Sequence, residues 1–283
     1  MNSVMHKAAA RGLAKRPTDL GYKHLSIDEK EVKKGHEYIS ILSDEQTGIV
    51  IGATAGITKQ SIEKLCTSAL TEHQRSKVET ICTDMWDTYI YGAKTYFPAA
   101  KHCHDNFHLV GYLNKAVDKV RRREVKQHEA LKNTKYIYLK DHMNLSEKQR
   151  IKFESIKDAN YEVSKAWRIK ENFRDIQFKQ TNDEAFIIYM RWRQAAMAAK
   201  IAEITEVVEM FDRHLKGIIN AIETGANNAR AERLDGPIQK LKTIGRGYRK
   251  TSNFIPAIMF FHGDLEIIYG LFLLSNKELK LGM

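Results

Sequence analysis

Residues 24–56, HLSIDEKEVKKGHEYISILSDEQTGIVIGATAG, decide the fold that this sequence predicts. They contain three short runs with the alternation and β-branched content of strands, at 24–28, 37–44 and 48–56. The second and third runs are joined by Glu-Gln-Thr-Gly at 45–48, a composition typical of a hairpin turn. The stretch therefore predicts a three-stranded meander at the start of a sheet.

The residues that follow alternate between helical and β patterns. The predicted elements are a helix at 61–70 with Ser61 as a candidate N-cap, a strand at 78–84, a helix at 85–97 and a short strand at 100–107. A meander followed by helix, strand, helix and strand is the order of an RNase H-like (retroviral-integrase-like) α/β core. Many other α/β domains begin in the same way, so the order alone does not fix the fold.

A helical region follows the predicted sheet. From about residue 109 to 223 the β-type runs disappear, and Lys, Arg, Glu, Ala and aromatic residues dominate. The best pattern is 204–225, where apolar residues recur at spacings of three and four and Gly225 stands at the position of a C-cap glycine. Residues 229–244 predict one more helix, which Gly236-Pro237 should kink or restart.

These patterns divide the chain into five segments. We expect a basic N-terminal lead-in, the first part of an RNase H-like core, a large all-α insertion, a segment whose helix completes the core, and a C-terminal tail. Their limits are 1–24, 25–119, 120–224, 225–258 and 259–283.

The composition indicates the class of partner. Lys and Arg outnumber Asp and Glu by 46 to 35, which gives a formal net charge of +11 and favours a polyanionic partner, either nucleic acid or an anionic membrane surface. The three cysteines form no CxxC pair, which fits a reducing cytoplasm. The longest apolar stretch, 265–274, is shorter than the roughly 20 residues that span a bilayer. We therefore expect a cytoplasmic protein that binds nucleic acid and does not enter a membrane.

Two aspartates stand where predicted strands end. Asp28 ends the first strand, and Asp84 ends the fourth. If those strands are neighbours in the sheet, both carboxylates project from the same end of it. Mg²⁺ prefers carboxylate oxygens, and two such ions about 3.5–4 Å apart can activate an attacking oxygen and stabilise a leaving one. Strand-end aspartates also cap loops and helices, so the pattern leaves both roles open.

Glu232 is the third acidic candidate. At about 100° per residue, it points away from the apolar stripe of its predicted helix. It could face a cleft while the stripe packs on the sheet, or it could be a solvated surface glutamate. The stripe consists of Ala231, Leu234, Ile238 and Leu241.

Residues 102–108, HCHDNFH, hold several potential metal ligands. Alternation along a strand puts His102 and His104 on one face and Asp105 on the other. A zinc site needs further ligands, and the chain has no CxxC or HExxH companion. Asp105 is a candidate acid close to the metal ions, and His108 would contact DNA or stabilise the turn into the next helix.

Two basic clusters are candidate DNA-binding residues, because Lys and Arg neutralise phosphates. A solvated helix face is the alternative for both. The first cluster is Arg121, Arg122, Arg123 and Lys126, and the second is Lys240, Lys242, Arg246 and Arg249. A set of aromatic residues could stack on unpaired bases, although a place in the helical core is the preferred interpretation; it comprises Trp167, Phe173, Phe178 and Trp192.

Four segments, in this order, resemble successive blocks of the ISL3-family insertion-sequence transposases. They are SIDEKEVKKGHEYISIL (26–42), CTDMWDTYI (82–90), HDNFHLVGYLNKAVDKVRR (104–122) and NNARAERLDGPIQKLKTIGRGYR (227–249). The resemblance runs from about Leu25 to Ile258. Asp235 and Gly236 depart from the family pattern, which has Asn and a residue other than Gly after the glutamate.

The resemblance implies a DDE transposase with an RNase H-like fold and a helical insertion between its second Asp and its Glu. By motif position, Asp28, Asp84 and Glu232 are the three acids that hold two Mg²⁺ or Mn²⁺ ions. Residues 105–108 resemble the D-x-x-H motif of related transposases, which implies that Asp105 and His108 lie close to the metal ions. The implied activity is cleavage of DNA at transposon ends, followed by strand transfer into target DNA.

The implied partners are transposon-end DNA, target DNA and further copies of the chain. Relatives usually carry an N-terminal zinc-binding and helix-turn-helix region that recognises the ends. Only about two dozen residues precede Asp28, so we expect either a separate end-recognition protein or a fragment of a longer chain.

Three alternatives stay open at this point. The first is a catalytically inactive DNA-binding remnant of a transposase, and the second is a structure-selective nuclease of the same fold. The third is a zinc hydrolase that uses His102, His104 and His108.

Overall fold

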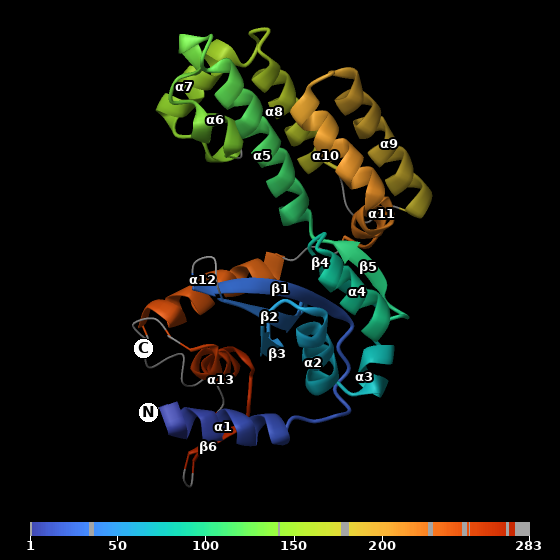
Figure 1. Cartoon of the computed structure of the whole chain (residues 1–283), viewed down its shortest axis with the longest axis vertical. Helices are drawn as coiled ribbons and strands as arrows, with labels where there is room; N and C mark the ends of the chain where they lie inside the picture. The colour runs from blue at the N-terminus through green and yellow to red at the C-terminus, as the bar shows by residue number, and fades with distance from the viewer. Residues whose placement is uncertain are drawn as a thin grey trace. The chain divides into compact units, whose positions relative to one another are not determined.

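The computed structural model describes residues 2–33, 37–140, 142–176, 181–225, 229–244, 248, 250–269 and 272–274. The chain forms two compact units (Figure 1). The sheet unit comprises Met1–Asp105 with Ala226–Met283, and the helical unit comprises Asn106–Gly225. The predicted limit at 119/120 falls inside one continuous helix, α5 (Asn106–Glu124), so the helical unit starts directly after the last strand of the sheet.

A five-stranded sheet is the centre of the sheet unit, with the strand order β3-β2-β1-β4-β5. β2 runs antiparallel to β1 and β3, whereas β1, β4 and β5 are parallel. The strands lie where the sequence predicts them, although β1 is longer than expected and the strands after it are the same length or shorter. Their bounds are β1 His24–Lys33, β2 Glu37–Asp44, β3 Val50–Ala55, β4 Thr80–Thr83 and β5 Lys101–His104.

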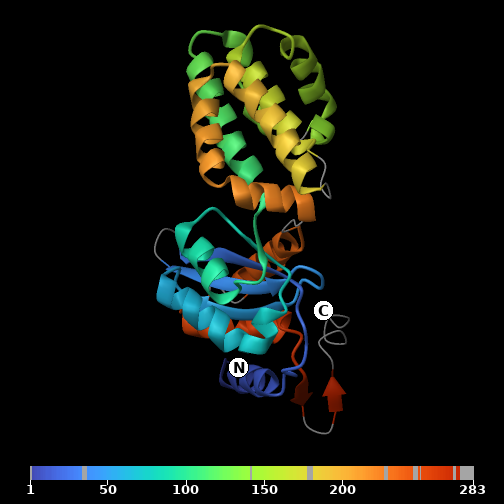
Figure 2. The ribbon, with the colours of Figure 1, turned by 90° about the vertical axis from the view of Figure 1, so that its right-hand side faces the viewer.

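Helices pack on both faces of this sheet (Figure 2). On one face, α2 (Lys59–Ala69) and α4 (Asp87–Tyr96) enclose a core that includes Leu25, Ile27 and Ile81. On the other face, a second core contains Ile39 and Ile41 of β2; its helices are α1 (Asn2–Ala14), α12 (Ala229–Ile244) and α13 (Thr251–His262). The unit also contains α3 (Glu72–Ser76) and the hairpin of β6 (Ile267–Tyr269) and β7 (Phe272–Leu274).

The structure adds one helix that the sequence does not predict and corrects the start of another. The lead-in at 1–24, whose structure the sequence leaves open, contains α1, and Ala9 of this helix is 2% exposed in the core. α2 begins earlier than predicted, because its N-cap is Thr58, whose side chain accepts a hydrogen bond from the Ser61 backbone at 3.2 Å. A hydroxyl one turn upstream performs the capping that the sequence pattern assigned to Ser61.

The helical unit contains no strand among its described residues. Its core includes the rings of Phe173, Trp192 and Phe211, whose centroids lie 4.8–5.9 Å apart. The α-helices are α5, α6 Lys135–Leu139, α7 Glu147–Ile156, α8 Glu162–Arg174, α9 Asn182–Ala198, α10 Ala202–Arg213 and α11 Leu215–Thr224; the 3-10 helices are Glu129–Leu131 and His142–Asn144.

The long helix predicted at 204–225 is two helices, because the chain turns at His214, where φ is −110° and ψ is 15°. Apolar spacing continues across the turn, so periodicity cannot distinguish one helix from two. Gly225 ends α11 in the left-handed conformation, with φ at 64°, as the sequence predicts. None of the described helices has the length and apolar character that crossing a membrane requires.

Candidate active site at the ends of the parallel strands

Three acidic residues follow one another across the parallel part of the sheet. Ile27 of β1 pairs with Thr83 of β4, and Thr83 pairs with His104 of β5. The next residue in each strand is acidic: Asp28, Asp84 and Asp105. Adjacent strands lie about 4.8 Å apart, so these three backbone positions are neighbours at the carboxyl edge of the sheet.

Strand alternation places Asp28, which lies inside β1, on the face of the sheet opposite to Ile27. Asp28 pairs with Ile41, and Ile41 belongs to the core beneath α12 and α13. Asp28 is therefore on the face that carries α12, the helix of Glu232, whereas Asp84 and Asp105 each follow the last residue of their strands.

Asp28 does not end its strand, contrary to the sequence prediction. β1 continues to Lys33 against β2, but its pairing with β4 stops at Ile27. Asp28 is thus the first residue beyond the β1–β4 ladder. Its carboxylate accepts hydrogen bonds from the Glu29 backbone at 2.8 Å and from Lys30 Nζ at 3.0 Å.

Asp84 follows β4 directly, as predicted. Its Oδ1 accepts a hydrogen bond from the Met85 backbone at 2.6 Å, and the side chain of Thr83 donates to its carbonyl oxygen. The backbone of Asp105 donates to the Thr83 carbonyl at 3.0 Å, which extends the β4–β5 ladder by one residue. Asp105 is 1% exposed, whereas Asp28 and Asp84 are half-buried, so the latter two are the more accessible to a ligand.

A buried acid, Glu45, shares this electrostatic environment. The pKa of Glu45 is raised to about 7, chiefly by burial; a hydrogen bond with Cys82 opposes this shift, and the negative charge of Asp105 contributes to it. Carboxylates that raise one another's pKa values disfavour additional negative charge in the same place. Asp105 thus acts on Glu45, whose backbone donates to the His24 carbonyl at the amino end of β1.

Glu232 lies in the first part of α12, and its side chain is outside the described part of the chain. The predicted apolar stripe is confirmed at Leu234, Ile238 and Leu241, which pack in the core against β1 and β2. Gly236 and Gln239, on the helix face that Glu232 shares, are exposed.

α12 continues through Gly236-Pro237 as one helix, so the predicted kink or restart at this pair does not divide it. Lys242, near the C-terminal end of α12, donates a hydrogen bond from Nζ to the Glu31 carbonyl of β1 at 3.2 Å. This contact holds α12 beside the strand that carries Asp28 (Figure 1).

The donor set at these positions fits a hard divalent cation. Half-buried carboxylates are the ligands that Mg²⁺ and Mn²⁺ prefer. Among the side chains that the structure describes, no three His, Cys, Asp or Glu residues converge as a metal-binding group. Glu232 is outside that set, and Asp28 is engaged by Lys30.

The comparison with known families decides the assignment. The family model of the ISL3-type DDE transposases, described as "Transposase", matches residues 25–258. The chain belongs to the ISL3 family of DDE transposases. The resemblance predicted from four sequence blocks is confirmed.

Curated transposases are similar to this ISL3-family chain along most of its length. The transposase for insertion sequence element IS1001 of Bordetella parapertussis is 21% identical over 259 residues, which are 89% of this chain and 64% of the relative. The transposase for insertion sequence element IS1557 of Mycobacterium tuberculosis is 23% identical over 265 residues, 84% of this chain and 59% of the relative. The chain thus spans about three-fifths of the length of these relatives.

The histidines of the ISL3-family chain do not form a zinc site with any third described ligand. His102 and His104 share a face, as predicted, with ring centroids 4.9 Å apart, and His102 Nε2 lies 2.8 Å from Thr83 Oγ1. The predicted alternation fails beyond His104, because β5 ends there and α5 begins at Asn106. His108 is therefore a helical residue, and its ring lies against Phe107.

Most of the first basic cluster is engaged in ion pairs within the helical unit. Arg121 donates two hydrogen bonds to Asp118, and Arg122 lies 2.6 Å from the same carboxylate. Burial alone raises the pKa of Asp118, but hydrogen bonds from the two arginines hold it below its ordinary value. Arg121 is 11% exposed and Arg122 is 69% exposed, so Arg122 is the more available to a phosphate.

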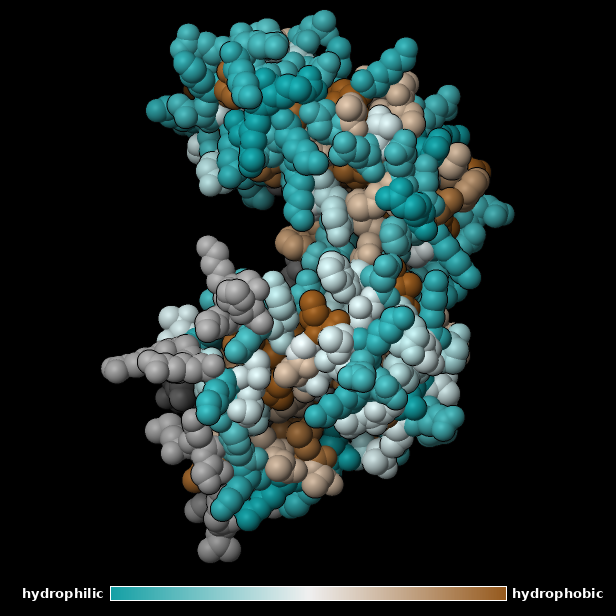
Figure 3. Space-filling model, in the orientation of Figure 1, coloured by the Kyte–Doolittle hydropathy of each residue, from teal (hydrophilic) through white to brown (hydrophobic). Residues whose placement is uncertain are grey.

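The other two members of this cluster also differ in how available they are to a phosphate. Arg123 bridges Glu162 and Glu203 in the helical unit. Lys126 is exposed and forms no ion pair with a described residue. The surface over α6 and α7 is predominantly hydrophilic on the face drawn in Figure 3.

The second basic cluster follows Glu232 in the sheet unit. Lys240 is exposed, and Lys242 is the residue that contacts Glu31. Arg246 and Arg249 lie outside the described residues.

The predicted stacking aromatics are core residues where they are described. Phe173 is 3% exposed and Trp192 is 6% exposed. Trp167 packs its ring on Phe153 at 4.6 Å. Phe178 lies outside the described residues. The preferred interpretation from sequence, a helical core, is confirmed for the three described rings.

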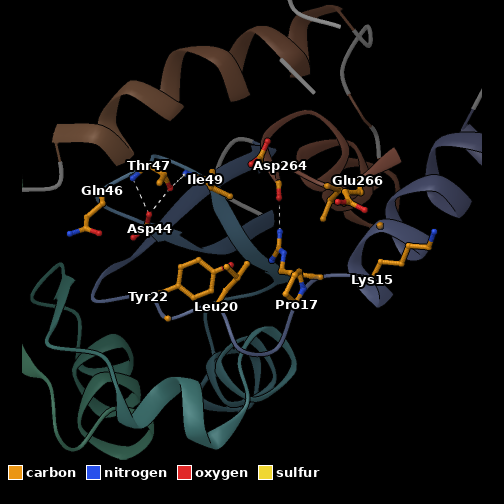
Figure 4. A pocket seen from close by; sticks show the side chains of 15 residues that line it. Lys15, Pro17, Leu20, Tyr22, Asp44, Gln46, Thr47, Ile49, Asp264 and Glu266 are labelled. Atoms are coloured by element: carbon orange, nitrogen blue, oxygen red, sulfur yellow. Dashed lines mark hydrogen bonds between the residues drawn. The ribbon is translucent and has the colours of Figure 1, made fainter. Parts of the chain in front are cut away.

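A cavity of about 440 Å³ lies elsewhere in the sheet unit (Figure 4). It is bordered by the segment after α1, the β2–β3 turn and residues 263–266. Arg16 joins these segments by donating to the carbonyls of Ile51 and Gly263, both at 2.6 Å. None of the predicted acids lines the cavity. It is a crevice around a structural arginine, separate from the candidate active site.

Two residues near the acids are missed by the sequence interpretation. Lys30, the partner of Asp28, escapes notice because the first strand is predicted to end at Asp28; a strand that continues places residue 30 on the same face. Trp86 follows Asp84 by two residues and is 54% exposed, which no pattern in the sequence indicates.

Proposed function

We propose that this chain is the catalytic part of a DDE transposase that cuts DNA at transposon ends and joins the freed 3′-hydroxyl to target DNA. The supporting observation is the row of residues that continues the Ile27–Thr83–His104 register, because Asp28 and Asp84 follow paired residues of neighbouring parallel strands. The antiparallel β2, the parallel β1, β4 and β5, and helices on both faces support an RNase H-like core. The helical unit would be the insertion between Asp84 and Glu232.

The position of α12 supports Glu232 as the third acid. Lys242 contacts Glu31, so the C-terminal part of α12 lies beside the distal part of β1. Glu232 lies about 15 Å back along the helix from Lys242, and Asp28 lies about 10 Å back along the strand from Glu31. Because α12 and β1 run alongside each other in the same direction (Figure 1), both counts lead toward the same end of the sheet.

In the proposed mechanism, Asp28, Asp84 and Glu232 would hold the two divalent metal ions. Mg²⁺ or Mn²⁺ would activate the attacking oxygen and stabilise the leaving oxygen. Lys30, which pairs with Asp28 at 3.0 Å, would be available to a DNA phosphate if the Asp28 carboxylate held a metal ion instead. Asp105 stays buried behind the site and orients the ladder that carries Asp84, with His108 following it at the start of α5.

DNA would be held by exposed basic residues, with Arg122, which is 69% exposed despite its ion pair with Asp118, and Lys126 and Lys240 as the described candidates. We extend the proposal to transposon-end and target DNA, to a homo-oligomer assembled on that DNA, and to a separate end-recognition protein. Such a protein would work at the nucleoid.

Nicking of supercoiled plasmid DNA in the presence of Mn²⁺ or Mg²⁺ tests this function. We expect the purified chain to nick the plasmid only when the metal is present. Asp84→Asn should lower the rate by at least about 100-fold, because one carboxylate oxygen is lost from both metal ions. Glu232→Gln should have a similar effect.

The matched control is Asp87→Asn, which changes an exposed acid in the first turn of α4. This variant should keep wild-type activity. Equal nicking by wild type and Asp84→Asn would contradict the assignment. DNA binding without metal-dependent nicking would favour the inactive remnant, for which the ion pair between Lys30 and Asp28 is the supporting observation.

A further inference from the structure

Trp86 is the exposed one of the three tryptophans, all of which lie in the described part of the chain. Its side chain is 54% exposed, whereas Trp192 is 6% exposed and Trp167 packs on Phe153. Tryptophan has a large apolar surface and is highly buried on average. An indole exposed to this extent on the sheet unit therefore needs an explanation.

The side chain of Trp86 does not cap the helix that it begins. It occupies the N-cap position of α4, where Ser, Thr, Asp and Asn are favoured because their side chains accept hydrogen bonds from the first turn. Trp86 makes no such bond. Its ring makes no aromatic contact with a described residue, whereas Tyr91 on the same helix contacts both Tyr96 and Lys59.

The backbone of Trp86 lies close to the candidate active site. Trp86 is two residues beyond Asp84, so their Cα atoms are at most about 7 Å apart. The Asp84 carboxylate binds the Met85 backbone, which fixes the short connection from β4 to α4. A DNA strand with its reacting phosphate at Asp84 would bring the adjacent nucleotide within reach of the indole.

We propose that Trp86 is a stacking platform for an unpaired base next to the phosphate that reacts at Asp84. The inference rests on the proposed function in one respect, which is that DNA approaches Asp84. Aromatic rings bind unpaired bases by stacking with little sequence preference, because every base has a π-face. The platform would hold the end of the DNA strand open and position it for the chemistry of Asp28, Asp84 and Glu232.

Intrinsic fluorescence of the whole chain reports on stacking independently of cleavage. We expect a short single-stranded oligothymidylate to quench the tryptophan emission of the wild type. Trp86→Phe should retain binding, because phenylalanine keeps a ring on which a base can stack. It should lose most of the quenching, because the two remaining indoles lie in the helical unit. Trp86→Ala should raise the dissociation constant for the oligonucleotide by roughly 5- to 100-fold.

Tyr91→Ala is the matched control, since it removes another exposed aromatic side chain from α4. It should leave both affinity and quenching unchanged. Full quenching in Trp86→Phe, or equal loss of affinity in Tyr91→Ala and Trp86→Ala, would overturn the proposal. Asp84→Asn separates the two hypotheses, because it should abolish nicking and keep the quenching.

Discussion

At the scale of single residues, the burial of Glu45 affects the stability of the fold. Its pKa rises from 4.5 to about 7 chiefly because the side chain is buried. The folded state therefore holds a proton that the unfolded state has released between these two pH values. Stability from this group is present below about pH 4.5 and is lost as the pH rises toward about 7.

Glu45→Gln should remove this loss. Relative to the wild type, the variant should gain about 2–3 kcal/mol of unfolding free energy between pH 5 and pH 8. Urea denaturation of both proteins at the two pH values measures the difference. Glu63→Gln, at an exposed position of α2, is the control and should show no such gain. A pH-independent difference between Glu45→Gln and the wild type would contradict the burial argument.

Single residues were predictable where a strand end fixed their place. Asp84 follows β4 as expected, and the neighbouring positions of Asp28 and Asp84 follow from the parallel pairing of β1 with β4. Ion pairs were not predictable, because they join residues across elements. The basic run at 121–123 reads as a DNA-binding cluster, yet Arg123 bridges acids from α8 and α10.

α12 is the element on which the candidate active site depends, because it carries Glu232. Its attachment to the sheet is made by Leu234, Ile238 and Leu241, with Ile238 3% exposed. Ile238→Ala should cost about 2–5 kcal/mol of unfolding free energy. It should also slow metal-dependent nicking under conditions where the protein remains folded, because α12 would be less firmly held.

The neighbouring exposed residue provides the control for this prediction. Gln239→Ala should change stability by less than about 0.5 kcal/mol and leave nicking intact. Urea denaturation and the plasmid assay measure both quantities. Normal nicking by a folded but strongly destabilised Ile238→Ala would contradict the dependence of the site on the packing of α12.

At the same scale, the sequence predicts the existence of elements better than their limits. Alternation places all five strands of the sheet, and the apolar stripe predicts which face of α12 is buried. The pattern does not reveal the turn at His214, because a one-residue turn leaves the apolar periodicity unchanged. It does not identify the Thr58 cap either, because several hydroxyl side chains near the start of α2 are candidates for the N-cap. β1 extends beyond its predicted end because it continues to pair with β2 after its pairing with β4 has stopped.

At the scale of the whole molecule, two units account for the described chain, and the helical unit interrupts the sheet unit between Asp105 and Ala226. The sequence predicts this interruption from the change in composition, but it places the start within α5 because a helix that begins directly after a strand shows no break in pattern. The order of the elements along the chain can thus be predicted from the sequence. Whether acids that are distant in the sequence lie together depends on tertiary packing.

Convergence of Asp28, Asp84 and Glu232 on one metal site is the central claim, and iron-mediated backbone cleavage tests it most directly. Fe²⁺ bound in place of Mg²⁺, with ascorbate and peroxide, generates oxidants that cut the nearest polypeptide. We predict cuts near residues 28, 84 and 232, suppressed by excess Mg²⁺ and absent in Asp84→Asn. Cuts near residues 28 and 84 without any near 232 would contradict the account.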